Sequence, residues 1–269
     1  MASLEEIQTG TIILPPRINL WGTEKVGKSE FAAGFPSPVF IPIKGETGLD
    51  EIVAGKFPPA NDFGDILDSL DELIGKEHSF QTVVIDSIST MIPLLEKYAV
   101  TTERVDNLQK LGGGYGNQEG VLKKYLSLLL ERLDYMRTDL NMTVILVGHI
   151  KASPRTINDP LTEPYDAWKV DVRDSLLDQL NRWSDCILFA DFEKHTRMVQ
   201  EEDKRSGKKK IVHATGLDKR VLYCQKRPGH PGGGRGVYGR LPYKLELSYD
   251  AFAAAVAAAR KTSSVSTGN

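Results

Sequence analysis

Residues 21–30 read WGTEKVGKSE, in which Gly22 and Gly27 stand five residues apart and Lys28 and Ser29 follow at once. This is the G-x-x-x-x-G-K-[ST] spacing of a loop whose backbone N–H groups wrap a polyphosphate. In such a loop the lysine reaches the β- and γ-phosphates and the hydroxyl ligates Mg²⁺. A plain glycine turn is the alternative. The pattern predicts a site for ATP and Mg²⁺, with nucleotide contacts from Gly22, Thr23, Glu24, Lys25, Val26, Gly27, Lys28, Ser29 and Glu30.

A second candidate metal ligand lies further along the chain. Asp86 closes the apolar run FQTVVID, and an acid at such a strand end holds magnesium in phosphate-loop proteins, usually through water. Because Ser87 and an expected helix follow, Asp86 is also a candidate helix N-cap, and both roles can hold together. The predicted metal ligands are therefore Ser29 and Asp86.

ATP hydrolysis also needs a residue that orients the attacking water. Glu46 follows the apolar segment PVFIPIKG and can act as a general base. His149 follows MTVILVG, where a polar side chain can sense the γ-phosphate. Each has a plainer alternative, a solvated loop acid or a hydrogen-bonded structural histidine. Together with Lys28, they are the predicted catalytic residues.

The segments that must position these side chains alternate between apolar strands and amphipathic helices. Strands are expected at 17–21, 38–43, 82–87, 142–150 and 185–192, and helices at 28–35, 65–75, 121–138 and 175–183, with another helix starting after residue 87. This alternation implies an α/β fold, a mostly parallel sheet covered by helices, with ligands at the carboxyl ends of the strands. The glycine loop lies at such an end, between a strand and a helix.

The character of the chain changes after residue 192. Two β-like runs, HTRMVQ and RVLYCQ, are separated by a charged turn, and a Gly- and Arg-rich loop at 227–242 precedes an alanine-rich helix. We therefore expect a phosphate-loop core at 1–192, a β-rich basic extension of the same domain at 193–260, and a disordered tail at 261–269.

Composition excludes several classes of protein. The net charge of −2 over 269 residues gives no global field for nucleic acid or anionic lipid, so such binding must come from a local patch. The two cysteines, Cys186 and Cys224, lack metal-ligand spacing and are expected to be buried reduced thiols. No signal peptide and no apolar run near the roughly 20 residues of a membrane span are seen. The expected compartment is the cytoplasm, without a membrane partner.

Four stretches, GTEKVGKS, VFIPIKGETGLDEI, TVVIDSIS and TVILVGHIKA, resemble the core of RecA-type ATPases. With GGYG at 113–116, DPLTEPYDAW at 159–168 and the late GRGVYGRLP, the chain more closely resembles phage-encoded, AAA-like ATP-binding proteins related to RecA. These include RecA-like single-strand annealing proteins. The resemblance covers roughly residues 15 to 245, and it implies a RecA-like phosphate-loop core in a protein of a bacterial host's cytoplasm.

The resemblance also implies roles for individual residues. Glu46 matches the catalytic glutamate on the strand after the phosphate loop, and Asp50 matches an acid that contacts the adenine amino group. His149 occupies the place of the RecA-type glutamine that links the γ-phosphate to a DNA-binding loop. A single-strand DNA-binding protein is an implied candidate partner.

In RecA-like folds two loops face single-stranded DNA, and here they correspond to 103–120 and 151–170. The cations could track phosphates and the aromatic rings could stack bases. The alternative is a pair of mobile surface loops whose aromatic side chains pack on the core, and acidic residues dilute the second loop. The DNA-binding candidates are Arg104, Lys110, Tyr115, Lys151, Arg155, Trp168 and Lys169.

A basic run follows the core. As a rule such a run is a solvated hairpin face. It could instead form an electrostatic track for DNA, or supply a lysine or arginine finger to the γ-phosphate of a neighbouring subunit, which requires a homo-oligomeric ring or filament. Its members are Lys204, Arg205, Lys208, Lys209, Lys210, Lys219, Arg220, Lys226, Arg227, Arg235 and Arg240.

Three functional hypotheses follow. The first is an ATP-dependent protein that binds single-stranded DNA and supports annealing or strand exchange, with ATP hydrolysis at the glycine loop. The second is an ATP-dependent switch or loader that acts on a replication protein. The third is a module that binds ATP without significant hydrolysis. Kinase chemistry ranks last, since no acceptor-binding lid is evident.

Overall fold

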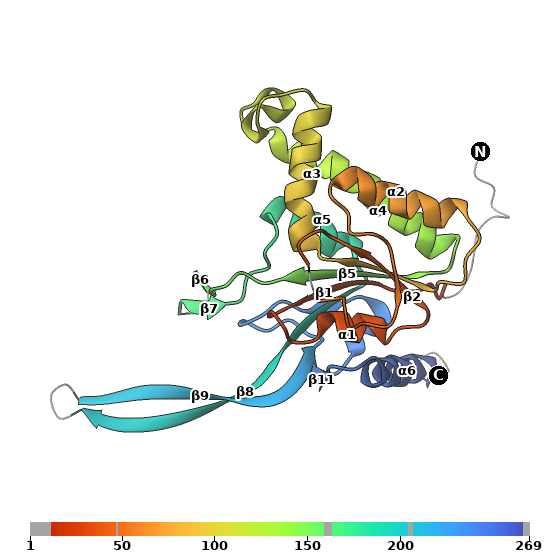
Figure 1. Ribbon diagram of the computed structural model, residues 1–269. Coiled ribbons are helices and arrows are strands. Elements are labelled where there is room, and N and C mark those ends of the chain that lie inside the picture. The colour runs from red at the N-terminus through yellow and green to blue at the C-terminus, as the bar shows by residue number, and fades with distance from the viewer. Residues whose placement is uncertain (1–11, 47, 159–162, 204–206, 266–269) are drawn as a thin grey trace.

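The computed structural model describes residues 12–46, 48–158, 163–203 and 207–265. Its centre is a nine-stranded sheet whose order is β11-β9-β8-β1-β5-β4-β2-β3, with β10 pairing to β8 (Figure 1). The strands are β1 Arg17–Gly22, β2 Pro38–Pro42, β3 Gly55–Lys56, β4 Thr82–Asp86, β5 Thr143–His149, β8 Cys186–Asp203, β9 Gly207–Tyr223, β10 Gly233–Gly234 and β11 Lys244–Glu246.

The sheet is mixed but mostly parallel. β1 pairs in parallel with both β5 and β8, and β4 pairs in parallel with β2 and β5. Only β9, β10 and β11 run antiparallel to their neighbours. The α/β class expected from the alternating pattern is therefore confirmed. The glycine loop leaves the carboxyl end of β1, which lies in the interior of the sheet, and the strands that end in Asp86 and His149 are on the same side of β1.

Helices cover both faces of the sheet. Helices α2, α3, α4 and α5 lie over one face, and α1 and α6 lie over the other (Figure 1). Their bounds are α1 Lys28–Ala33, α2 Phe63–Gly75, α3 Ile88–Thr102, α4 Gln118–Thr138, α5 Asp174–Trp183 and α6 Tyr249–Val265.

Buried apolar side chains form two clusters, one on each face of the sheet, because successive side chains of a strand alternate between the faces. In β4, Val83 and Ile85 belong to the cluster under α2–α5, whereas Val84 belongs to the cluster over α1 and α6. Successive side chains of a strand point to opposite faces, so a continuous apolar run is required where both faces are covered. The central residues of these strands are thereby buried on both faces of the sheet.

The second half of the chain contains a long β8–β9 hairpin that projects from the body of the molecule (Figure 1). The sequence indicates a strand at 185–192 and two further β-like runs, but β8 is continuous from Cys186 to Asp203. A register shift between Phe192 and Lys194 marks the change from sheet strand to projecting ribbon. Such an irregularity bends and twists a strand without ending it.

Several shorter elements have no counterpart among the expected ones. A small hairpin joins β6 Arg155–Ile157 to β7 Tyr165–Ala167, and short 3-10 helices span Leu108–Gly113 and Gly236–Arg240. Helix α4 begins at Gln118, before the expected residue 121.

The carboxyl-terminal helix is longer than the sequence suggests. The disordered tail is expected from residue 261, yet α6 continues to Val265, and Thr262 Oγ1 donates a 3.1 Å hydrogen bond to Ala258 O inside it. The remaining part of that expectation, residues 266–269, lies outside the described residues. None of the helices formed by the described part of the chain is both long and apolar enough to cross a membrane.

Candidate nucleotide site

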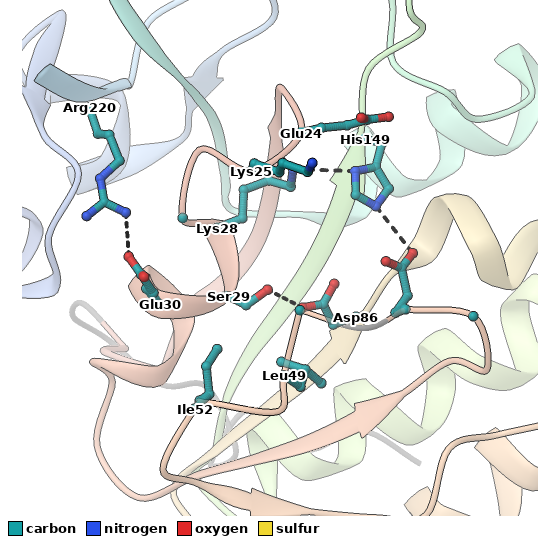
Figure 2. Close-up of a pocket in the computed structure, with 14 residues that line it drawn as sticks. Glu24, Lys25, Lys28, Ser29, Glu30, Leu49, Ile52, Asp86, His149 and Arg220 are labelled. Carbon is teal, nitrogen blue, oxygen red and sulfur yellow. Dashed lines mark hydrogen bonds and ion pairs between the residues drawn. The ribbon is translucent and has the colours of Figure 1, made fainter. Parts of the chain in front are cut away.

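A cavity of about 580 Å³ opens at the carboxyl ends of β1, β4 and β5 (Figure 2). The register of the sheet determines which residues meet there. Gly22 pairs with His149 and Asp86 pairs with Val147, so the carboxyl ends of three strands lie together. It is lined by Glu24, Lys25, Gly27, Lys28, Ser29, Glu30, Gly45, Glu46, Gly48, Leu49, Ile52, Asp86, His149 and Arg220.

Lys28 lies beneath the glycine loop and is almost completely buried. Its Nζ donates to Thr23 O at 2.7 Å and Gly22 O at 3.3 Å, and lies 3.4 Å from His149 Nδ1. Burial lowers the pKa of Lys28, although the negative charges nearby oppose this shift. Within the described residues it forms no ion pair with a carboxylate, so a buried ammonium group is left to an external anion. Phosphate oxygens fit that requirement.

The loop itself depends on its two glycines. A Cβ added at Gly22 would lie 2.3 Å from Ala190 O, which shows that β8 leaves no room for a side chain there. Gly27 adopts φ 99°, a left-handed conformation that glycine takes without strain. Thr23 anchors the loop to β8, because its N–H donates to Ala190 O and its Oγ1 donates to Asp191 Oδ1, both at 3.2 Å.

Ser29 and Asp86 form the pair of oxygen groups expected at a magnesium site. Ser29 Oγ donates a 2.5 Å hydrogen bond to Asp86 Oδ2, and Asp86 is buried. Burial raises the pKa of Asp86, while the hydrogen bond from Ser29 works against that rise. Hydroxyl and carboxylate oxygens are the hard ligands that Mg²⁺ takes in proteins. The alternative role falls to a neighbour, since the N-cap of α3 is Ser87, whose Oγ accepts from Thr90 N at 3.3 Å.

Glu46 lies beyond β2 and lines the same cavity as Asp86. Ser87 Oγ donates to its Oε1 at 2.7 Å, Thr90 Oγ1 donates to the same oxygen, and His149 Nε2 lies 3.3 Å away. The hydrogen bond with His149, followed by those from the two hydroxyls, lowers the pKa of Glu46 to about 2. Glu46 is therefore a carboxylate at neutral pH, held in one orientation by three donors.

His149 lies between Lys28 and Glu46. Its backbone N–H donates to Ser89 Oγ at 2.9 Å, which fixes the end of β5 against α3. The preceding residue, Gly148, lies against the indole of Trp21, and an added Cβ would be only 2.2 Å from that ring. The buried Trp21 ring thus supports the strand end that carries His149.

The remaining predicted nucleotide contacts are distributed unevenly. Glu24, Lys25 and Glu30 line the cavity, whereas Val26 is buried in the core. Asp50 is exposed and does not line the cavity. Its neighbours Leu49 and Ile52 do, and sequence reasoning missed them, although two apolar residues three positions apart in an otherwise polar loop were a usable signal. Arg220, 190 residues from Glu30, is a lining residue that the sequence placed only within a basic run.

The DNA-binding candidates fall into two separate groups. Lys151, Arg155 and Lys169 line a second cavity of about 420 Å³ beside α3, which also contains Ser89. Lys169 pairs with Asp174 at 2.7 Å. Within the described part of the chain, the side chains of Lys151 and Arg155 have no hydrogen-bond or ion-pair partner.

The other candidates lie elsewhere. Arg104, Lys110 and Tyr115 belong to the segment beyond the carboxyl end of α3, far from the β6–β7 hairpin (Figure 1). There the Tyr115 ring is fully exposed and Lys110 pairs with Asp106. Trp168 is partly buried against the core, with Lys194 Nζ 5.3 Å from its ring centroid. The packed alternative considered for the loop aromatics thus applies to Trp168, but not to Tyr115.

Comparison with known proteins gives one decisive match. A family model described as an AAA domain matches residues 14–236. No curated protein matches the chain. Among solved structures, the chain is similar to one titled "Crystal structure of the RadB recombinase", with 15% identity and a TM-score of 0.41, over 74% of this chain and 87% of that chain. Because the family match spans most of its 269 residues, and the phosphate-loop motif lies within it, the chain is a phosphate-loop protein of the AAA domain family.

Proposed function

We propose that this chain is an ATPase that binds single-stranded DNA and supports annealing or strand exchange. The observation that carries the ATPase half is the meeting of Lys28, Ser29, Glu46, Asp86 and His149 in one cavity at the strand ends. A glycine loop, a buried lysine, a hydroxyl–carboxylate pair and an oriented second carboxylate are the parts that phosphoryl transfer to water requires.

Each side chain has a distinct task in this proposal. Lys28 offers its buried ammonium group to phosphate oxygens, and Ser29 and Asp86 hold Mg²⁺, which would neutralise charge on the phosphates. Glu46, kept ionised by its three donors, accepts a hydrogen bond from the attacking water and orients it. His149 contacts both Lys28 and Glu46, so it is placed to respond to an occupied phosphate site.

The DNA half rests on the second cavity. Ser89 lines that cavity and accepts a hydrogen bond from the backbone N–H of His149, which lines the nucleotide cavity, so this hydrogen bond connects the two cavities. Lys151 and Arg155 supply cations for DNA phosphates, whose binding would be salt-dependent. The exposed Tyr115 supplies a separate ring on which a base could stack. Assembly into a homo-oligomer would align such sites along a strand.

Two measurements test the proposal. ATP turnover with Mg²⁺ should be measurable and should increase with single-stranded oligonucleotide, and EDTA should abolish it. Fluorescence anisotropy of a labelled oligonucleotide should show binding that weakens with salt and in a Lys151→Ala/Arg155→Ala double variant. Absence of DNA binding at low salt, with or without Mg²⁺ and ATP, removes the DNA half of the proposal and leaves the ATPase half standing.

One observation favours a protein partner as the second candidate. The carboxylates of Glu96, Asp171 and Asp174 also line the second cavity and oppose its cations. A mixed surface of this kind suits an ATP-dependent switch or loader acting on a replication protein. Strong ATP turnover together with salt-insensitive, weak DNA binding would favour this function over the first.

A further inference from the structure

Arg220 reaches the nucleotide cavity from β9, the strand beyond β8 in the sheet order. Its Nη1 donates a 2.5 Å hydrogen bond to Glu30 Oε2, and both side chains are substantially exposed at the cavity mouth. A Cβ added at Gly27 would lie 2.5 Å from the same Nη1. The guanidinium group therefore lies directly against the backbone of the glycine loop of its own chain.

Two neighbouring residues of α1 mark the two ends of the cavity. Ser29 bonds to Asp86, toward the end that also contains Glu46 and His149. Glu30 points the other way and bonds to Arg220, and Figure 2 shows Arg220 and Glu30 opposite Asp86 and His149. Since the metal-binding pair lies at the β- and γ-phosphate end, Arg220 lies at the end left for the α-phosphate and ribose.

We propose that Arg220 is a nucleotide-binding residue that acts in cis, by exchanging the carboxylate of Glu30 for an α-phosphate oxygen. This inference rests on the proposed ATP site and extends it with a residue that no motif contains. It differs from a trans-acting finger, because the side chain already borders the cavity of its own chain. An arginine fork can pair with either a carboxylate or a phosphate, so Glu30 competes with the nucleotide for the same donors.

The position of Arg220 dictates a kinetic signature. The α-phosphate is present in both ADP and ATP and does not change during hydrolysis. A contact with it therefore stabilises the bound substrate and the transition state equally. Loss of Arg220 should raise the Kd for ADP and ATP by the same factor and raise KM, with kcat little changed. A finger on the γ-phosphate of a neighbouring subunit would instead lower kcat and act only in assembled protein.

The experiment measures binding of fluorescent N-methylanthraniloyl ADP and of a non-hydrolysable fluorescent ATP analogue to the full chain. Arg220→Ala should weaken both by about tenfold or more, the loss expected for one charge-assisted hydrogen-bonding group. Glu30→Gln should tighten both severalfold, and should have no effect in the Arg220→Ala background. Arg132→Ala is the matched control, because Arg132 of α4 forms a similar ion pair with Asp71 of α2 at 2.7 Å, and neither residue lines this cavity.

The outcomes separate the inference from the function it rests on. If the wild-type chain binds neither nucleotide, the proposed ATP site fails. If the wild type binds nucleotide and Arg220→Ala, with an unchanged thermal transition, binds ADP and ATP as tightly as the wild type does, the cis role of Arg220 is wrong. Loss of ATP turnover that appears only at protein concentrations that permit assembly, with ADP affinity intact, also overturns it in favour of a trans-acting residue.

Discussion

Ser29 and Asp86 lie 57 positions apart in the chain, and the hydroxyl of one donates a 2.5 Å hydrogen bond to the carboxylate of the other. They belong to different elements, the start of α1 and the end of β4, with β5 between their strands in the sheet. A parallel sheet makes such meetings possible because all its strands deliver their carboxyl ends to one edge. Function at this edge therefore depends on strand register as much as on the glycine loop.

Lys28→Ala should abolish phosphate-dependent nucleotide binding and leave the fold intact. The substitution removes a buried ammonium group whose partners, among the described residues, are two backbone carbonyl oxygens and His149. Folding therefore loses little, whereas phosphate loses its charge-assisted donor. We expect nucleotide affinity to fall by at least roughly a hundredfold, about 2.7 kcal/mol, so that phosphate-dependent binding is no longer detected. Isothermal titration with ATP and Mg²⁺ measures the affinity, and circular dichroism checks the fold. Tight ATP binding by the variant contradicts the role given to Lys28.

Glu46→Gln should lower ATP turnover while preserving ATP binding. Glutamine keeps the size and can still meet the hydroxyls of Ser87 and Thr90, but it has no negative charge to orient and polarise water. A loss of roughly a hundredfold to ten-thousandfold in kcat is the range for removing such a residue. Phosphate release and nucleotide affinity are measured on the same preparation.

The third hypothesis, ATP binding without hydrolysis, gives a different result in that experiment. Wild-type turnover would then be at background, and Glu46→Gln would change nothing. The two hypotheses are thus separated by the wild type before the variant is considered.

Much of the cavity was predictable because its residues follow short-range rules. The glycine loop has a fixed spacing, and Asp86 and His149 each end an apolar run that is typical of a strand covered on both faces. Glu46 depended on the resemblance as well as on its strand. These positions required no knowledge of how distant segments pack, beyond the rule that parallel strands end together.

The positions of Arg220 and Asp50 relative to the cavity could not be predicted from the sequence. Arg220 reaches the cavity only because β9 pairs with β8 and β8 pairs with β1, a relationship between segments that no local pattern encodes. Asp50 was placed by resemblance, but in the loop after β2 it is the apolar Leu49 and Ile52 that face the cavity. Loop conformation depends on backbone geometry and packing, which residue type alone does not determine.

Gly148→Ala should destabilise the protein and disturb His149. The added methyl group would lie 2.2 Å from the buried Trp21 ring, so either the indole or the end of β5 must move. Overpacking of this kind costs about 1–3 kcal/mol. Chemical denaturation measures the loss, and Gly75→Ala is the control, because a methyl group there meets nothing within 4 Å. Equal stability of Gly148→Ala and wild type would show that the strand end tolerates displacement.

Asp185 offers a prediction that is independent of nucleotide, because it lies at the opposite end of β1. Arg17 donates to it from its backbone N–H at 3.0 Å, from Nε at 3.1 Å and from Nη2 at 2.9 Å, and Arg137 lies 3.4 Å away. Burial alone would raise the pKa of Asp185, but the hydrogen bonds and charge of Arg17 outweigh it and hold that pKa below the usual value. The carboxylate is thus a stabilising group in its ionised form.

The sign of the pH dependence follows from this lowered pKa. An acid that is harder to protonate in the folded state contributes stability above its unfolded pKa of about 3.9, and this contribution is lost as the pH falls through the folded pKa. Asp185→Asn should therefore cost about 3 kcal/mol at pH 7, where it leaves Arg17 without its buried partner. The difference in unfolding free energy between wild type and variant should shrink steadily below about pH 4, because protonation makes the wild-type side chain resemble the amide. Urea denaturation from pH 7 to pH 3 tests this, and a difference that stays constant over that range would mean that Asp185 is not the charged partner of Arg17.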